Sequence, residues 1–408
     1  MIHVNNQSSL KKTMCTILNG FVSTCYSKTQ KKTKLYKKSI MRFFKITIVL
    51  LCIWQTSIAQ NYIPIDTLNW DIRAKSYELK HYKGKDAIYI ENGAIFLKNA
   101  KFLNGTIEFD IFLNEERMYP GVFFRADENF NNGEQWFIRT HLSGLEDGNQ
   151  AAPATNGITP FQFYFGPKYS FAYDYKYDDW THVKVVVNND KAQVFLDHAK
   201  KPNLSWNLFH EPKAGGLMIR GGRVPMHIAD VKVNINEYKL IDFNPIEKKP
   251  IESLIQEWEV SDKFEEKLLE DPTKISSVIK ERKWGRTIEL EEGIAANISR
   301  VQVLRNGTPG ETVFARVIID SDYNQIKLFH FGYSDRVIAI LNDEAIYKGD
   351  NGWRTRDYRY LGTIGLFDGI YLNLKKGKNT LLMAVSENFG GWLITGKFDN
   401  NKGIKILK

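Results

Sequence analysis

Cysteine is nearly absent from this sequence, and its copies all lie close to the N-terminus. The three cysteines are Cys15, Cys25 and Cys52. The chain beyond residue 60 therefore has no thiol for a disulfide, a nucleophile or a zinc site. Cysteine chemistry is excluded as the basis of its stability or its function.

Acidic residues are absent from the first 60 positions, which contain ten Lys or Arg and no Asp or Glu. Subtracting these ten from the 56 basic residues of the whole chain leaves 46 basic against 47 acidic residues. The formal charge of +9 thus belongs to the leader and not to the folded part. The charge pattern gives no support for a nucleic acid partner.

The leader has the pattern of a signal peptide. The basic start Met41–Lys45 is followed by the mostly apolar run Ile46–Trp54 and then by Thr56–Gln60. The apolar run is too short to span a membrane, and we expect cleavage next to Ala59. The pattern predicts export to the periplasm or the cell surface.

Residues 1–40 lack a structural pattern, and we interpret Met41 as the true start of translation. The alternative is a long cytoplasmic segment before the apolar run. Val49–Cys52 is similar to a lipoprotein cleavage site, but Leu51 stands where a small residue is expected. This mismatch argues against lipidation.

Several catalytic and metal-binding signatures are missing. There is no Gly-x-Ser-x-Gly, no phosphate-binding loop and no Rossmann fingerprint. The histidines after residue 180 are scattered without metal-ligand spacing. Asp127, Glu128 and Asp147 leave calcium as a possible cofactor, although no loop with fixed oxygen ligands is visible.

Short β-branched and aromatic runs dominate residues 86–233. Expected β stretches include Asn104–Leu113, Gly121–Arg125, Gln135–His141, Phe161–Gly166 and Trp180–Asp197, the last with a hairpin turn at Asn188–Asp190. In the first of these, apolar side chains alternate with Glu108 and Asp110, so one face is expected in a core and the other toward water or a ligand. We also expect a hairpin at Asn92-Gly93 and a long loop over 142–160.

A polar segment at 238–250 predicts a linker before a second β-rich region. The sequence thus predicts an all-β protein with two β-sandwich (jelly-roll) domains. The expected division is a leader at 1–60 with the signal peptide at 41–60, a first sandwich at 61–237, the linker at 238–250 and a second sandwich at 251–408.

Four segments of the first region carry a resemblance to a known superfamily. They are Gly105–Asp110, Gly121–Arg125, Trp180–Val185 and Val194–Asp197. The region resembles the concanavalin A-like lectin/glucanase jelly rolls, more narrowly the laminin-G and 3-keto-disaccharide hydrolase-like kind. Through Phe331–Asn342 and Leu374–Leu382, the second region resembles galactose-binding-like jelly rolls. The resemblance implies that the chain handles carbohydrate.

The resemblance to laminarinase-type enzymes is incomplete at the catalytic motif. Those enzymes carry Glu-x-Asp-x-x-Glu, whose two outer carboxylates act as nucleophile and acid/base. Glu108 and Asp110 match the first two positions, but Leu113 replaces the last carboxylate. This mechanism then has no proton donor, which favours binding over hydrolysis.

A candidate substrate-binding set combines hydrogen-bonding and aromatic side chains that suit sugar hydroxyls. Arg139 and His141 are expected to share one strand face, and Gln162 and Tyr164 another. The complete set is Arg125, Arg139, His141, Gln150, Asn156, Gln162 and Tyr164. The alternative is an ordinary outer face on which Arg139 pairs with an acidic neighbour.

Three functions remain open on the sequence. The first is an exported carbohydrate-binding protein with a glycan or oligosaccharide as its partner. The second is a glycan-active hydrolase or lyase of the 3-keto-disaccharide hydrolase-like kind. The third is a protein-interaction module of a surface complex. Aromatic and Arg side chains near 353–358 and 388–392 suit either sugar stacking or packing between the two sandwiches.

Overall fold

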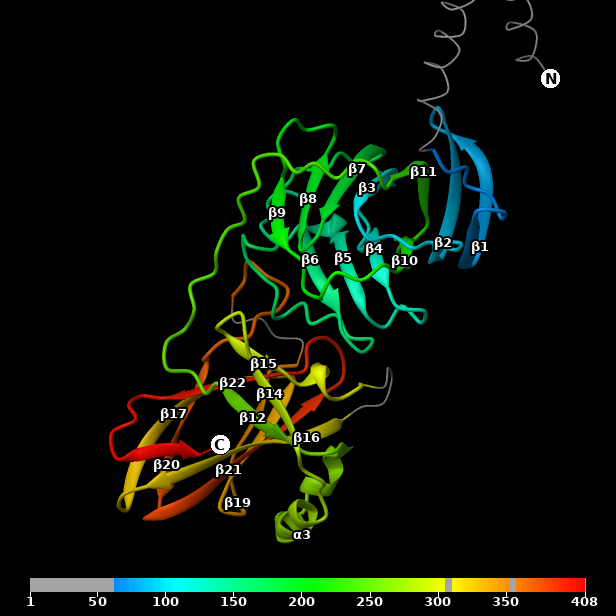
Figure 1. The fold of residues 1–408 in the computed structure, drawn as a ribbon. Helices are drawn as coiled ribbons and strands as arrows, with labels where there is room; N and C mark the ends of the chain where they lie inside the picture. The colour runs from blue at the N-terminus through cyan, green and yellow to red at the C-terminus, as the bar shows by residue number, and fades with distance from the viewer. Residues whose placement is uncertain (1–61, 305–309, 353–356, 408) are drawn as a thin grey trace, which may run out of the picture. The chain divides into compact units, whose positions relative to one another are not determined.

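The computed structural model describes residues 62–304, 310–352 and 357–407. It is all-β, and two sheets each fold into a sandwich, as the sequence predicts (Figure 1). The predicted signal peptide lies outside the described residues. No helix in the described part is long and apolar enough to cross a membrane.

The first sheet has eleven strands, in the order β6-β5-β4-β10-β2-β11-β3-β7-β8-β9, with β1 paired to β2. The strands are β1 (Trp70–Tyr82), β2 (Lys85–Leu97), β3 (Gly105–Leu113), β4 (Gly121–Ala126), β5 (Gly133–Ile138), β6 (Asn149–Ala154), β7 (Asp179–Asn188), β8 (Lys191–Leu196), β9 (Leu204–Asn207), β10 (Gly216–Arg220) and β11 (Met226–Asn234). A short 3-10 helix, η2 (Thr140–Leu142), follows β5.

The second sheet has twelve strands, in the order β19-β18-β21-β16-β12-β14-β15-β22-β17-β20, with β13 and β23 paired to β16. The strands are β12 (Glu257–Val260), β13 (Phe264–Glu265), β14 (Arg286–Glu291), β15 (Ala295–Asn297), β16 (Glu311–Ser321), β17 (Gln325–Ser334), β18 (Arg336–Leu341), β19 (Glu344–Asp350), β20 (Asp368–Leu374), β21 (Gly377–Glu387), β22 (Leu393–Phe398) and β23 (Ile404–Leu407). The helical turns are η3 (Glu266–Leu269), η4 (Pro272–Lys274), α3 (Ile275–Lys280) and η5 (Ile298–Arg300).

Alternation along β3 places its apolar side chains in the first core. Ile107, Phe109 and Ile111 are fully buried and pack with residues of β2, β4 and β7. The predicted strand face is therefore correct. The opposite face is less open than expected, because Asp110 is only 5% exposed.

The expected hairpin at Asn92-Gly93 is wrong, because β2 continues through both residues. The chain reverses instead at Lys83 and Gly84, between β1 and β2. Gly93 lies opposite Ala74, and a Cβ atom at this position would come within 2.3 Å of the Arg73 carbonyl oxygen. Glycine at this position permits the close approach of β1 and β2. In the sequence, such a glycine cannot be distinguished from one that forms a turn.

Two other local expectations fail around the first sandwich. Residues 161–166 form turns and not a strand, and the expected loop over 142–160 contains β6. Strand β5 ends at Ile138, so Arg139 and His141 do not share a strand face. Turn-forming Gly and Pro next to these runs outweigh the β propensity of their aromatic residues.

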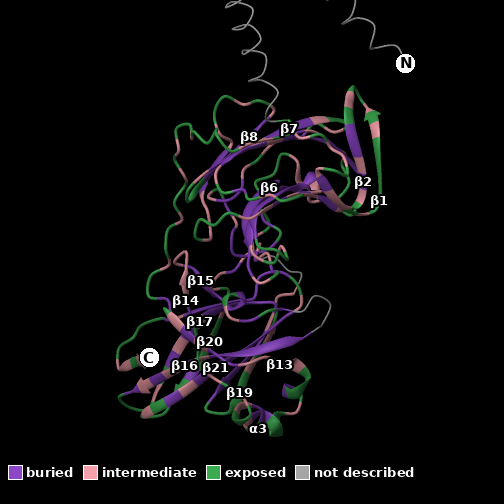
Figure 2. Cartoon of the chain, turned by 45° about the vertical axis from the view of Figure 1, so that its right-hand side comes forward, coloured by how far each residue is buried: buried purple, intermediate pink, exposed green. Residues whose placement is uncertain are grey.

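The segment between β11 and β12 contains no strand and is largely exposed (Figures 1 and 2). It is attached to the first sandwich through Gln193, whose side chain exchanges hydrogen bonds of 2.6 and 2.9 Å with the backbone of Ile241. Lys191 also lies over the ring of Phe243, at 5.3 Å from its centroid. These contacts hold the segment beside strands β8 and β9.

Candidate functional site

A groove of about 610 Å³ lies between this connecting segment and the first sandwich. One wall is formed by residues 167–172, another by the turn between β8 and β9, and a third by residues 242–246. Arg359 and Tyr360 of the second β-rich region close one part of it. Apart from Leu204 and Ser205 of β9, the lining residues lie in loops and turns, so strand periodicity could not reveal the groove.

Two aromatic side chains line the groove. Phe171 is half-buried, and Tyr360 is 5% exposed with its hydroxyl donating a 2.8 Å hydrogen bond to Glu146. Burial and the neighbouring Glu146 carboxylate raise the pKa of Tyr360. The hydroxyl therefore stays protonated at neutral pH and fixes Glu146 at the edge of the groove.

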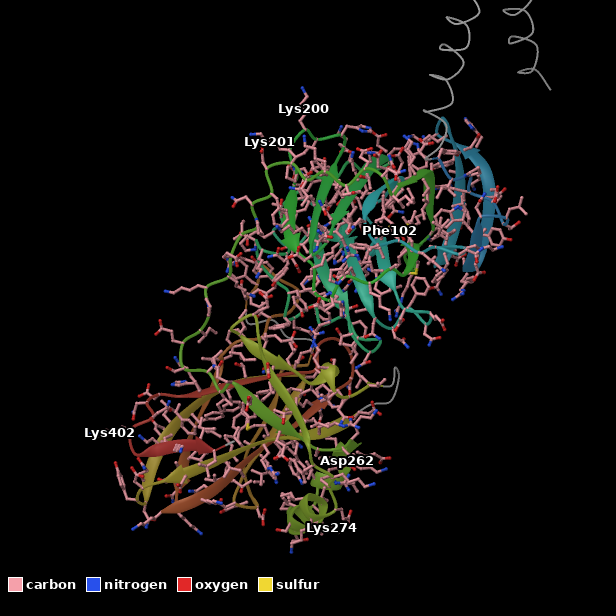
Figure 3. The ribbon with its side chains drawn as sticks, in the orientation of Figure 1. Phe102, Lys200, Lys201, Asp262, Lys274 and Lys402 are labelled. Carbon is pink, nitrogen blue, oxygen red and sulfur yellow. The ribbon has the colours of Figure 1, made fainter. Side chains whose placement is uncertain are left out.

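Several polar side chains of the groove have no partner within the described part of the chain. Lys201, Asp242 and Asn244 are exposed and form no side-chain hydrogen bond or ion pair there. Figure 3 shows Lys200 and Lys201 extending from the turn that follows β8. Such groups can exchange their hydrogen bonds with water for hydrogen bonds with a polar ligand.

The charges that line the groove are balanced. Glu146 and Asp242 carry negative charge, and Lys201 and Arg359 carry positive charge. Arg359 is already paired with Asp357 at 2.7 Å and lies 3.7 Å from Glu146. The groove thus offers hydrogen bonding without a net charge that would select an anion or a cation.

Arg139, a predicted substrate-binding residue, is a buried structural cation. It is 1% exposed, and its guanidinium pairs with Asp147 at 2.5 Å and donates to Gln150 at 2.5 Å. The other oxygen of the Asp147 carboxylate accepts a 2.7 Å hydrogen bond from the backbone N–H of Leu361. This chain of contacts links the end of β5 to the second β-rich region.

The side chains of Gln150, Gln162 and Tyr164 are also enclosed. Gln150 is fully buried and donates to the carbonyls of Phe161 and Tyr164. Gln162 accepts a 2.7 Å hydrogen bond from the Gly391 N–H. Tyr164 is 1% exposed in a cluster with Ile294 and Leu393, so Gln162 and Tyr164 join the two sandwiches, whereas Gln150 bonds within the first.

The remaining predicted residues lie apart from one another. Asn156 donates a 2.7 Å hydrogen bond to the Ser299 carbonyl. Arg125 donates to the carbonyls of Leu103 and Asn189 at 2.8 and 2.6 Å. His141 is half-buried.

None of the seven predicted residues lines the groove. Binding of a saccharide by these residues stays an untested prediction. Their hydrogen-bonding groups were visible in the sequence, but whether those groups face a ligand or the protein depends on packing between the sandwiches.

The Glu108–Asp110 pair is engaged with cations on the face of the first sheet. Asp110 accepts from His182 at 2.6 Å and also pairs with Lys85, while Glu108 lies 3.5 Å from both His182 and Lys184. Burial alone would lower the pKa of His182, but its hydrogen bonds to Asp110 and Glu108 raise that pKa to about 9. Both carboxylates therefore face a protonated imidazole at neutral pH.

Two of the acidic residues considered as calcium ligands bind neighbouring groups of the protein. Asp127 accepts from the backbone of Asn131 and from the side chain of Asn132, both at 2.8 Å. Asp147 is paired with Arg139. Within residues 62–304, 310–352 and 357–407, no group of three His, Cys, Asp or Glu side chains is placed to hold a metal ion.

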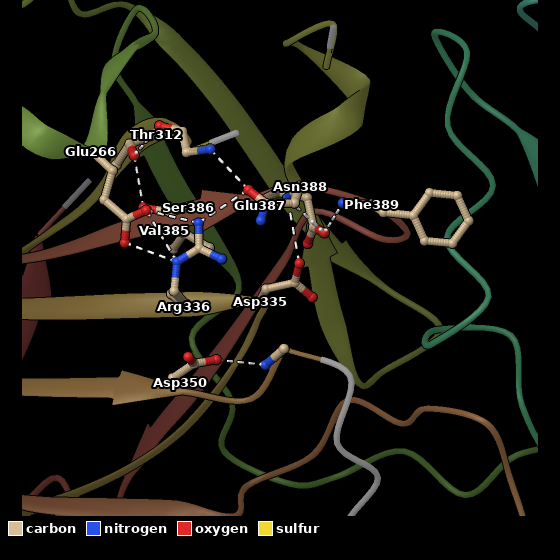
Figure 4. A network of polar contacts seen from close by, with 12 residues as sticks. Glu266, Thr312, Asp335, Arg336, Asp350, Val385, Ser386, Glu387, Asn388 and Phe389 are labelled. Atoms are coloured by element: carbon tan, nitrogen blue, oxygen red, sulfur yellow. Dashed lines mark hydrogen bonds and ion pairs between the residues drawn. The ribbon is translucent and has the colours of Figure 1, made fainter. Parts of the chain in front are cut away.

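A second polar network lies at one end of β18 and β21 (Figure 4). Arg336 pairs with Glu266 at 2.7 Å and donates to Asn388 at 3.1 Å. Glu387 is fully buried and accepts a 2.9 Å hydrogen bond from the Phe389 N–H. Burial and the nearby Asp335 raise the pKa of Glu387 well above its ordinary value, which favours the protonated form of this carboxyl.

This protonation predicts the effect of replacing Glu387. Glu387→Gln resembles the protonated acid and is expected to change the free energy of unfolding at pH 7 by less than about 1 kcal/mol. Glu387→Ala is expected to cost about 1–3 kcal/mol, because the Phe389 N–H loses its acceptor. Urea unfolding of both variants measures the difference.

The pH dependence has a defined sign. Because the folded-state pKa is raised above 4.5, the wild-type carboxyl contributes stability that is lost as pH rises. The stability of the Gln variant relative to the wild type should therefore increase as pH rises above 4.5. An increase toward lower pH would contradict a raised pKa of Glu387.

No family model matches this sequence, and no curated protein does. Several solved structures match parts of it. Carbohydrate binding module CBM66 from Bacillus subtilis has 14% identity and a TM-score of 0.32, covering 41% of this chain and 95% of its own. A non-specific endo-beta-1,3(4)-glucanase from family GH16 has 11% identity and a TM-score of 0.32, covering 44% and 88%.

A third match is domain 4 of a GH43 extracellular arabinanase from Geobacillus stearothermophilus. It has 11% identity and a TM-score of 0.26, covering 40% of this chain and 79% of its own. These three matches are a carbohydrate-binding module, a glucanase and a domain of an arabinanase. Because all of these scores are below 0.5 and the identities are at most 14%, the likeness carries no information about ligand or activity.

Proposed function

We propose that this protein is an exported carbohydrate-binding protein that binds a neutral saccharide in the groove beside residues 242–246. The observation that carries the proposal is the combination of Phe171 and Tyr360 with the free polar side chains of Lys201, Asp242 and Asn244. A sugar ring has an apolar face for aromatic contact and hydroxyls for hydrogen bonds. The balanced charge of the groove favours a neutral saccharide.

Binding without hydrolysis is supported by the Glu108–Asp110 pair. Leu113, which replaces the last carboxylate of the laminarinase motif, is fully buried in the core. Asp110 is held by Lys85 and His182. A carboxylate in these contacts is poorly suited to attack a sugar.

A glycan array with the full-length protein, followed by titration calorimetry, tests the proposal. We expect binding to at least one neutral glycan without release of reducing sugar. Lys201→Ala and Asn244→Ala should each weaken binding about 3- to 10-fold, the effect of one lost hydrogen bond. Both residues are exposed, so these changes should not disturb folding.

Lys200→Ala is the matched control, since Lys200 is exposed in the same turn and does not line the groove. Its affinity should equal that of the wild type. The proposal is overturned if no glycan binds, or if the two groove variants bind as tightly as Lys200→Ala.

A further inference from the structure

A second cavity, of about 420 Å³, shares a wall with the groove. Its lining residues are Phe165, Asp357, Tyr358, Arg359, Thr363 and Phe367. Arg359 lines both the groove and the second cavity. Each volume is within the range of sites for small ligands, and the shared residue makes them neighbours.

The side chains at the boundary between the two cavities contact one another through aromatic rings and hydrogen bonds. The ring of Phe165, on the side of the second cavity, lies 5.5 Å from the ring of Tyr360 in the groove. Asp357 accepts from Arg359 at 2.9 and 2.7 Å. The guanidinium is thereby fixed, while its side chain stays 50% exposed.

The second cavity has the chemistry of a sugar site by itself. Three of its six lining residues are aromatic, and Tyr358 is 93% exposed and Phe367 is 40% exposed. Arg359 brings hydrogen-bond donors beside these rings. Flat rings beside such donors suit the face and edge of a sugar ring.

We infer that the two cavities are adjoining subsites for one oligosaccharide, with Arg359 at their junction. This inference rests on the proposed function and narrows its ligand to a chain of linked sugars. A fixed guanidinium between two aromatic walls can donate to the oxygens that join neighbouring sugar units. Linked units that occupy both subsites bind more tightly than either unit alone.

Length-dependent binding tests the inference. The full-length protein is titrated with saccharides of one to six units, one ladder from laminarin and one from the best-binding glycan of the array. We expect affinity to rise at least about tenfold between the shortest binding saccharide and those long enough to fill both subsites. Tyr358→Ala should remove most of this rise and leave binding of the short saccharides unchanged.

Tyr371→Ala is the control, because Tyr371 is 73% exposed and lines neither cavity. It should preserve the full length dependence. Two adjoining subsites are excluded if short saccharides bind but affinity does not increase with length. They are also excluded if Tyr358→Ala shows the same increase as the wild type. In both cases the proposed binding site in the groove is unaffected. If neither ladder binds, the proposed function fails and this inference fails with it.

Discussion

Arg139→Met is expected to lower the free energy of unfolding by about 3–5 kcal/mol, because it leaves the buried Asp147 carboxylate without its cation. Both side chains are 2% exposed, so water cannot replace the lost partner. Asp147 also accepts from the Leu361 N–H, and its disturbance should loosen the contact between the sandwiches. Urea unfolding followed by tryptophan fluorescence measures the change.

Arg125→Met is the matched control for this loss. Arg125 is also buried, at 8% exposure, but it donates to two backbone carbonyls and the Asn104 side-chain carbonyl, not to a carboxylate. Its replacement should cost less, about 1–2 kcal/mol. Equal losses in the two variants would contradict the role given to the Arg139–Asp147 ion pair.

His182 is expected to stabilise the fold in a pH-dependent way. Its folded-state pKa of about 9 lies above its ordinary value of 6.5. The contribution is therefore fully present below pH 6.5 and is lost as pH rises through 9. Ideal linkage gives about 3 kcal/mol, and solvent screening at the sheet surface reduces this to about 1–2 kcal/mol.

The measurement is the difference in unfolding free energy between the wild type and His182→Gln from pH 6 to pH 10, together with the NMR titration of the imidazole. His227→Gln is the control with the opposite sign. Burial and Lys80 lower the pKa of His227 to about 4, so its effect should be confined to pH 4–6.5. If the His182 imidazole titrates near pH 6.5, His182 does not stabilise the fold in this pH-dependent way.

The sequence alone determined the fold class and most of the strands. Alternation in Asn104–Leu113 placed β3, because a strand with one buried face leaves a period of two in the sequence. The turn at Asn188–Asp190 separated β7 from β8. Strands such as β6 and β15, with five Ala between them, lack this signal and were missed.

Tertiary structure decided which polar side chains are available to a ligand. Arg139, Gln150 and Gln162 have the chemistry of sugar-binding residues, but their hydrogen bonds are used within the protein, at or beside the junction of the sandwiches. Lys201, Asn244 and Arg359 come from three loops, whose approach depends on how the connecting segment packs against β8 and β9. Contacts between residues so far apart in the chain have no local pattern, so only the folded structure could bring the groove to view.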